Sequence, residues 1–200
     1  MIVFKRMNAL SRGLNWLYSA TIDRSKFREV AQRYTVFILP LFFWGRAIDD
    51  RGLLIAAVGV FIRAWAAGYL KKDQELTQGG PYVLARHPLY LGSCLLALGL
   101  IVALHHWAVT VLLGGITALT YAHTIRHEEK NLNARFGTAY AELSRRAGPL
   151  WPKPAGLLYA LRTPGAVFGG FSFRQYLRNR EYECLTGAVA VFAILYYSAP

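Results

Sequence analysis

The hydrophobic positions of this chain gather into long runs, and most of the basic residues lie between them. The four longest runs are residues 52–70, 88–105, 107–125 and 184–199, and Arg63 is their only Lys or Arg. Each run approaches the roughly 20 residues that an α-helix needs to cross the hydrocarbon core of a bilayer. A fifth run, residues 34–45, is shorter and is flanked by arginines. The pattern therefore predicts an all-α, integral-membrane helical bundle.

The positions of Lys and Arg decide whether the short run at 34–45 counts as a span. If it crosses the membrane, 20 of the 23 Lys and Arg lie on one side, two lie on the other, and Arg63 lies inside. If it does not cross, the two sides hold 9 and 13 Lys and Arg residues, which is no clear bias. Cytoplasmic loops of membrane proteins carry an excess of basic residues. About five spans are therefore predicted, with the N-terminus and the polar loops cytoplasmic and the C-terminus on the opposite side.

The chain is expected to fall into three parts. Residues 1–33 repeat apolar side chains every three or four positions, which indicates either a basic amphipathic helix on the membrane surface or a short helix packed on the bundle. Residues 34–148 form the predicted membrane core, in which His105-His106-Trp107 can join two spans only as a tight antiparallel hairpin. Residues 149–200 hold an interfacial segment rich in Pro, Gly and Arg, followed by the last span.

Composition narrows the classes of partner. The chain has 200 residues, 54% hydrophobic and 17% charged, with a net charge of +12. Since the basic residues lie mostly on one side of the predicted bundle, they favour contact with an anionic membrane leaflet, and they give no reason to expect nucleic acid. The two cysteines form no CxxC pair, so a disulfide framework or zinc site is not expected. Oligomeric state is left open.

The predicted topology brings distant polar residues to one depth near the cytoplasmic surface. Arg63 lies within the second span, His87 and Tyr90 begin the third, and Glu128 and Glu129 follow the fourth. Ionisable residues inside a membrane usually serve a function. Each residue alone has a structural reading as well: His87 simply precedes a helix that starts with proline, and the glutamates can form a solvated helix face.

Metal and nucleotide motifs are absent from the sequence. His123, His127 and Glu128 share a helical spacing but do not form HExxH, and five scattered histidines cannot supply the boxes of a membrane di-iron enzyme. No metal site is therefore predicted. There is also no GxGxxG fingerprint, Walker A loop or GxSxG, so a Rossmann domain is not expected.

Two motifs resemble a known family. Residues 80–92 read GPYVLARHPLYLG, residues 128–132 read EEKNL, and residues 136–140 read FGTAY. This order is similar to the GPYxxxRHPxYxG and EExxLxxxFGxxY signature of the isoprenylcysteine carboxyl methyltransferase family, which is related to the membrane phospholipid N-methyltransferases. Together with Arg63, the resemblance covers about two fifths of the chain.

The resemblance implies a membrane enzyme that uses S-adenosylmethionine, with a cofactor pocket between the membrane and the cytosolic segments. The residues carried over for the cofactor are Tyr82, His87 and Tyr90 for the methionine portion, Leu91 as pocket lining, and Glu129 with Glu128 for the ribose or amino group. Arg63 matches an arginine near the reacting centre and is the catalytic candidate. One position departs from the family: Thr124 stands where an arginine is common, with Arg126 nearby.

Several acceptors and two other classes remain compatible with the sequence. A prenylcysteine-type carboxylate is the favoured acceptor, because Arg63 can orient a carboxylate by a bidentate contact. A phospholipid amine, which needs deprotonation by Glu128 or His87, and a small thiol are the alternatives. The other classes are an NADPH-dependent, sterol-type membrane reductase and a non-enzymatic membrane scaffold or small transporter.

Overall fold

The computed structural model describes residues 43–45, 47–71 and 75–199, to which all structural statements below refer. The chain divides into two compact units, Met1–Trp44 and Gly45–Pro200. Nearly all of the first unit lies outside the described residues, as do the predicted amphipathic segment 1–33 and all but the last three residues of the predicted short span at 34–45. The second unit contains the rest of the predicted bundle.

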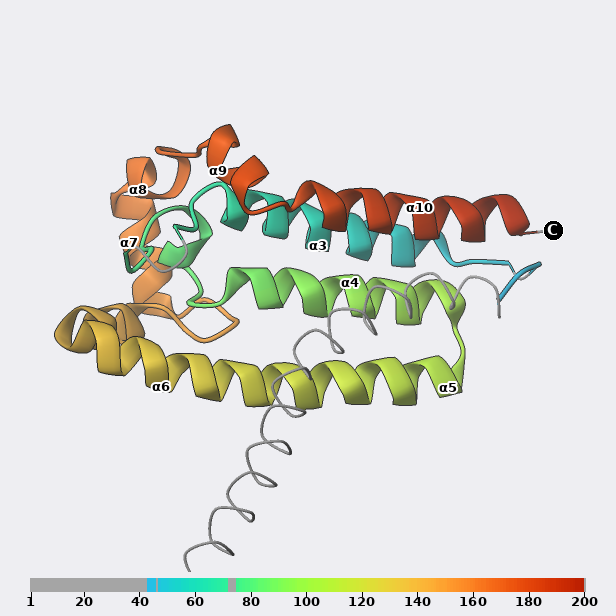
Figure 1. Cartoon of the computed structure of the whole chain (residues 1–200), viewed down its shortest axis with the longest axis horizontal. Helices are drawn as coiled ribbons and strands as arrows, with labels where there is room; N and C mark the ends of the chain where they lie inside the picture. The colour runs from blue at the N-terminus through green and yellow to red at the C-terminus, as the bar shows by residue number, and fades with distance from the viewer. Residues whose placement is uncertain (1–42, 46, 72–74, 200) are drawn as a thin grey trace, which may run out of the picture. The chain divides into compact units, whose positions relative to one another are not determined.

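The described part of the second unit is all-α (Figure 1). Its long helices are α3 (Asp50–Ala67), α4 (Pro88–Leu104), α6 (Gly115–Arg146) and α10 (Tyr182–Ser198). The shorter elements are the 3-10 helix η1 (Gly80–Val83), α5 (Trp107–Val109), the π-helix η2 (Thr110–Gly114), α7 (Pro154–Arg162), α8 (Pro164–Phe168) and α9 (Phe173–Arg178). Two isolated β-bridges, Ala85 with Gly148 and Ala147 with Pro152, pin the loop after α6.

The four long apolar runs all coincide with helices. The run at 107–125 falls in α5, η2 and α6, which continue without a break as Trp107–Arg146. Among the described residues this stretch is the one helix long and apolar enough to cross a membrane, while α4 and α10 are apolar but shorter, with 17 residues each. The all-α class is therefore confirmed for the described part of the chain, and the count of five spans stays a prediction.

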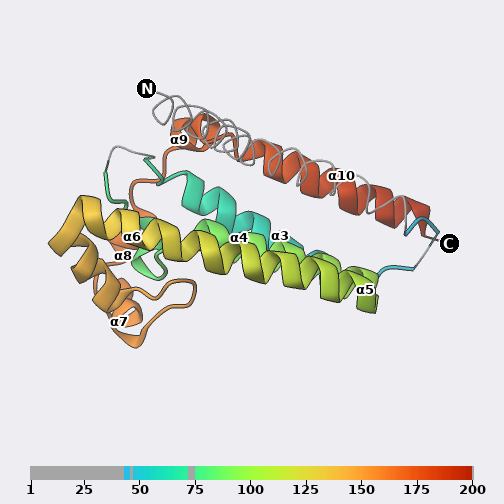
Figure 2. The ribbon, with the colours of Figure 1, turned by 60° about the horizontal axis from the view of Figure 1, so that its bottom comes forward.

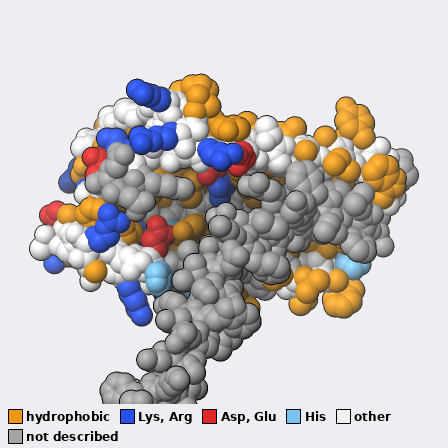
Figure 3. Space-filling model, viewed as in Figure 1, with side chains coloured by type: hydrophobic (Ala, Val, Ile, Leu, Met, Phe, Trp, Pro, Cys, Tyr) orange, Lys and Arg blue, Asp and Glu red, His pale blue; other side chains and the backbone are white. Residues whose placement is uncertain are grey.

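Large apolar side chains cover the outside of these helices. Phe61 on α3, Leu119 on α6 and Tyr197 on α10 are among the exposed ones, and Leu119 is 76% exposed. In the space-filling view, hydrophobic side chains predominate at the end near the C-terminus, whereas Lys and Arg gather near α7–α9 (Figure 3). A soluble protein rarely exposes contiguous apolar surface of this kind, so the distribution suits contact with lipid.

The helices α3 and α4 pack backbone against backbone along a seam of small residues. A Cβ atom built on Gly99 would lie 2.7 Å from the amide nitrogen of Ala56 and 2.7 Å from the carbonyl oxygen of Gly52. One built on Gly59 would lie 2.7 Å from the carbonyl oxygen of Gly92. Small residues let membrane helices approach closely where the hydrophobic effect gives no drive to associate. The seam therefore fixes α3 against α4.

The predicted hairpin between the third and fourth spans is present. His105 adopts the left-handed conformation (φ 44°, ψ 44°), and its amide donates to the carbonyl of Ile101 at 3.0 Å. The His106 ring then accepts a hydrogen bond from the amide of Ala108, which caps the next helix. The chain reverses within these residues, and α6 runs back beside α4 (Figure 2).

A bend at Gly137 turns the end of α6 back towards α7 (Figure 1). Gly137 has φ 44° and ψ −112°, a conformation that residues with a Cβ rarely adopt. Beyond the bend, Tyr140 and Leu143 are buried. The predicted span ended at residue 125, but the helix continues past it because Glu, Lys and Arg end an apolar run without ending a helix.

The segment predicted to be interfacial, as loops with or without one short surface helix, forms three short helices, α7, α8 and α9, near the C-terminal end of α3. The side-chain amide of Gln175 donates to the carbonyl of Leu70 at 2.7 Å, and that of Asn179 donates to the carbonyls of Ala67 and Leu70 at 2.8 and 2.9 Å. The last carbonyls of a helix have no partner within the helix. These contacts therefore supply donors for α3 and hold α9 in place.

The glycine seam predicts a position-specific loss of stability. Gly99→Ala places a methyl group against the backbone of α3, and overpacking of this kind typically costs about 1–3 kcal/mol. We expect a lower midpoint of thermal unfolding for this variant in detergent. Gly187→Ala on α10 is the matched control, because a Cβ there meets nothing within 4 Å. Equal midpoints for the two variants would contradict the close packing of α3 and α4.

Candidate functional site

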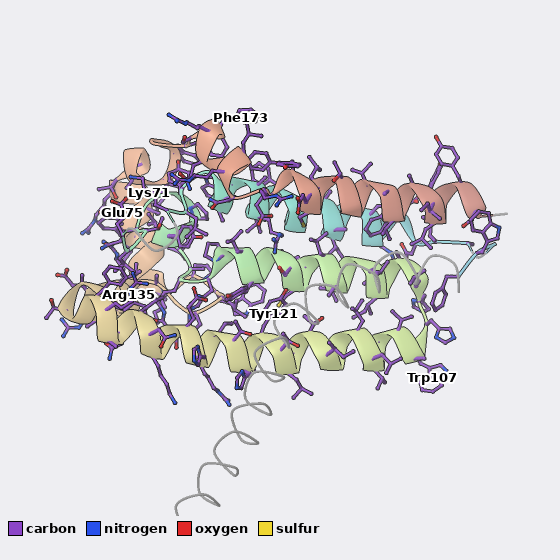
Figure 4. All side chains as sticks on the ribbon, in the orientation of Figure 1. Lys71, Glu75, Trp107, Tyr121, Arg135 and Phe173 are labelled. Atoms are coloured by element: carbon purple, nitrogen blue, oxygen red, sulfur yellow. The ribbon has the colours of Figure 1, made fainter. Side chains whose placement is uncertain are left out.

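A cavity of about 510 Å³ lies at the end of the bundle where α3 finishes and α4 begins. Residues of α3, η1, α4, α6 and the α9–α10 junction line it. The polar lining residues are Arg63, Lys71, Glu75, Thr77, Tyr82, Arg86, His87, Tyr90, Glu128, Asn131, Arg135, Tyr140 and Glu181, and the apolar ones are Leu70, Leu76, Leu89, Leu132, Phe136 and Leu143. Figure 4 labels Lys71, Glu75 and Arg135 at this end and Trp107 at the other.

His87 is held at the centre of the predicted set. Its backbone amide donates to the carbonyl of Pro149 at 3.0 Å, and Pro88 follows it as the first residue of α4. The ring is 97% buried, with Nδ1 3.5 Å from Glu128 Oε2 and Nε2 3.6 Å from Glu129 Oε1. The imidazole and both carboxylates, some 40 residues apart in sequence, are therefore brought together as predicted.

Aromatic rings surround the imidazole. The ring of Tyr90 stacks on that of His87 with ring centroids 5.6 Å apart, and the ring centroids of Tyr121 and Tyr90 are 5.1 Å apart. Tyr121 points from α6 towards α4 (Figure 4). Tyr82, in η1, is buried in a cluster with Ala66 and Tyr69. The site thus has stacking surfaces on more than one side.

Two phenols of the cavity stay protonated at neutral pH. Burial raises the pKa of Tyr82 well above its usual range, because the ionised form is poorly solvated there. Burial likewise raises the pKa of Tyr140 to about 12. Both hydroxyls can therefore donate a hydrogen bond to a ligand in the cavity.

Arg86 organises the carboxylate side of the site. Its side chain is only 9% exposed, and its Nε and Nη2 both donate to Glu129 Oε1. Its Nη1 donates to the carbonyls of Ser144 and Ala147, and its guanidinium lies 5.7 Å from the centre of the Tyr140 ring. Arg86 thereby ties the start of α4 to both parts of α6.

Arg63 projects from α3 into the cavity and is fully engaged. Nε and Nη2 donate to the two carboxylate oxygens of Glu181 at 3.0 and 2.8 Å. Nη1 donates to Ser93 Oγ and, at 3.3 Å, to the carbonyl of Leu89, both on α4. The Arg63 and Glu181 side chains are 20% and 11% exposed. The edge of Arg63 that was expected to receive an acceptor carboxylate therefore carries Glu181.

Two predicted cofactor residues do not line the cavity. Leu91 is absent from its wall, because the helical turn at the start of α4 points Leu89 and Tyr90 inward instead. Glu129 lies behind the residues that line the cavity, where it pairs with Arg86 and its Oε1 is 3.6 Å from His87 Nε2. At the position that departs from the family, Thr124 Oγ1 donates to the carbonyl of Thr120 within α6.

Sequence reasoning missed Arg86 and Glu181. Arg86 lies in the first motif, immediately before His87. Its position could therefore have identified it, but no role was predicted for it. Glu181 lies in a segment without a periodic pattern, and its proximity to Arg63 depends on how α7–α9 fold. Within the described residues no group of three or more His, Cys, Asp or Glu is placed to hold a metal ion.

Comparison with known proteins connects this site to a family. Residues 52–139, which include Arg63, the first motif and all of the second except Tyr140, match the family model described as phospholipid methyltransferase. The resemblance to the related membrane methyltransferases is therefore confirmed. No solved structure matches significantly.

Two curated relatives match over 104 residues, or 51% of this chain. The cobalt-zinc-cadmium resistance protein CzcN of Cupriavidus metallidurans is 38% identical over 46% of its length. The nickel-cobalt-cadmium resistance protein NccN of Alcaligenes xylosoxydans xylosoxydans is 32% identical over 47% of its length. The match thus spans about half the length of each relative.

The partly buried Arg86–Glu129 pair predicts a loss of stability on truncation. Arg86→Met removes the charge and leaves Glu129, whose side chain is 28% exposed, and two backbone carbonyls without this donor. Loss of a hydrogen-bond partner by a buried polar group typically costs about 1–3 kcal/mol. We expect a clear drop in the denaturant midpoint. Arg162→Met, at an exposed site on α7, is the matched control. An Arg86→Met midpoint equal to that of the control would show that the pair contributes nothing.

Proposed function

We propose that this chain, whose residues 52–139 match the phospholipid methyltransferase family model, is an integral-membrane enzyme that transfers the methyl group of S-adenosylmethionine to a lipophilic acceptor. The observation that carries the proposal is the meeting of His87 with Glu128 and Tyr90 at one cavity, with Glu129 next to His87 behind the cavity wall. The family match supports methyl transfer, and the cavity supports a binding site for the cofactor.

The residues present fit the cofactor. His87 Nε2 is buried and makes no hydrogen bond within the described part of the chain, so it has capacity for a ligand. The phenols of Tyr82 and Tyr140 supply donors for a carboxylate, and Glu128 supplies an acceptor for ribose hydroxyls or an ammonium. A volume of about 510 Å³ lies within the range of small-molecule sites.

The reaction mainly requires the protein to align the acceptor with the methyl group. A bound sulfonium cofactor supplies an already activated methyl group, so no metal or nucleophilic side chain is required. The tasks left to the chain are to hold the acceptor in line with the methyl group and to exclude water. The aromatic wall of Tyr90 and the apolar side chains Leu89, Leu132 and Phe136 suit the second task.

Arg63 is the proposed acceptor-orienting residue for a prenylcysteine-type carboxylate. A carboxylate reacts as the anion and needs no base, only a bidentate contact that fixes its direction. A phospholipid amine would instead require Glu128 or His87 to remove a proton, and a small thiol would also react as its anion. The cavity wall contains groups for each of these acceptors, and product identification separates them.

His87→Ala is expected to weaken binding of S-adenosylhomocysteine by about tenfold or more, because the hydrogen bond and the stacked ring are both lost. Isothermal titration of the purified protein in detergent measures this change. The exposed His123→Ala is the matched control and should bind as wild type. Titration with NADPH in parallel tests the reductase alternative: NADPH binding without S-adenosylhomocysteine binding would overturn the proposal, and binding of neither would favour a scaffold or transporter.

Arg63→Ala is expected to abolish methyl transfer to a carboxylate acceptor while the affinity for S-adenosylhomocysteine stays close to wild type. The reason is that the hydrogen bonds of Arg63 go to Glu181, Ser93 and the carbonyl of Leu89, which are not cofactor candidates. Steady-state kinetics with labelled cofactor, together with titration, separate the two effects. Retained turnover on a carboxylate would remove Arg63 from its proposed role.

A further inference from the structure

The side of Arg63 that faces Glu181 has the geometry of a carboxylate-binding site. Nε and Nη2 form the edge of a guanidinium that holds the two oxygens of a carboxylate in parallel, and Glu181 fills this edge at 3.0 and 2.8 Å. Both residues line the cavity. An acceptor carboxylate that uses the same edge has to take the place of Glu181.

Arg63 does not need Glu181 to keep its direction. Nη1 is held from α4 by Ser93 Oγ and by the carbonyl of Leu89, and Ser93 Oγ itself donates to that carbonyl at 3.0 Å. The aliphatic part of Arg63 lies directly against Gly92, where a Cβ would come within 2.5 Å of Arg63 Cγ. The guanidinium is therefore anchored through α4, and its other edge remains oriented into the cavity when Glu181 leaves.

Glu181 comes from a part of the chain that is separate from α3 and α4. It precedes α10 at the α9–α10 junction, next to Arg180, whose φ of 57° is unusual for a residue other than glycine. Asn179 ties this junction to the end of α3 through the carbonyls of Ala67 and Leu70. Glu181 also lies outside the residues that match the family model.

We infer that Glu181 competes with the acceptor for Arg63 and so acts as a specificity-determining residue, which sets how tightly this site takes carboxylates. The inference deepens the proposed function and rests on it for the meaning of the acceptor. With Glu181 in place, Arg63 and Glu181 present a neutral wall, and an anionic head must displace a carboxylate that is only 11% exposed. Without the charge of Glu181, the same edge becomes an open site for an anion.

The test is a binding measurement that needs no cofactor. N-acetyl-S-farnesylcysteine and its methyl ester are titrated in detergent micelles against the purified full chain, and the ratio of their dissociation constants is the readout. Glu181→Gln should tighten binding of the acid by about tenfold and leave the ester unchanged, because a hydrogen bond to a charged group is worth about this much. Glu183→Gln, which removes the same charge two residues away outside the cavity wall, should change neither.

Two further variants make the competition specific to Arg63. The double variant Arg63→Gln with Glu181→Gln should lose the gain for the acid. Glu181→Asp keeps the charge but shortens the side chain, so it should give an intermediate gain, and it serves if Glu181→Gln fails to fold. An unchanged or weaker affinity for the acid in Glu181→Gln and Glu181→Asp, or a gain that persists in the double variant, would overturn the inference.

Failure of this inference and failure of the proposed function give different results. If the chain does not use S-adenosylmethionine, wild type shows no affinity for S-adenosylhomocysteine while the acid-to-ester ratio still responds to Glu181. If Glu181 only stabilises the fold, S-adenosylhomocysteine binds and the ratio stays the same. The two titrations therefore test separate statements.

Discussion

The site depends on the backbone contact between α3 and α4. Glycines on both helices leave no room for side chains along this seam, so α3 lies at a fixed distance and register on α4. Arg63 continues the seam one turn beyond Gly59, with its stem against Gly92. In a membrane, where burial of apolar surface gives little drive for helices to associate, this close contact is what positions a charged side chain at the cavity.

Paired charges complete the site around this contact. Arg86 joins the start of α4 to Glu129 and to the bent end of α6, while Arg63 joins α3 and α4 to the start of α10 through Glu181. Each pair crosses between elements that are distant in sequence. His87 lies near both glutamates of α6. The arrangement places donors and acceptors at one end of an otherwise apolar bundle, which is where a zwitterionic cofactor and a lipophilic acceptor can meet.

The sequence predicted the parts of the site that local patterns carry. Apolar runs located four helices, and the two motifs with the topology brought His87, Tyr90, Glu128 and Glu129 together. Leu91, predicted to line the pocket, does not line this cavity, since only the structure gives the rotation of α4 about its axis. Arg63 was expected to bind the carboxylate of an acceptor, yet in the structure its guanidinium pairs with Glu181. That pair depends on how the short helices α7, α8 and α9 pack, and sequence patterns do not predict this packing.

The claim that this chain transfers a methyl group to a lipophilic acceptor can be measured directly. Purified full-length protein reconstituted in lipid vesicles is incubated with methyl-labelled S-adenosylmethionine and a detergent extract of membranes, and the lipid-soluble products are separated and identified. The match of residues 52–139 to the phospholipid methyltransferase family model, together with the His87–Glu128 site, predicts label in a lipophilic product whose reactive group reveals the acceptor. Absence of label from every lipophilic product, with S-adenosylmethionine left intact, would contradict the claim.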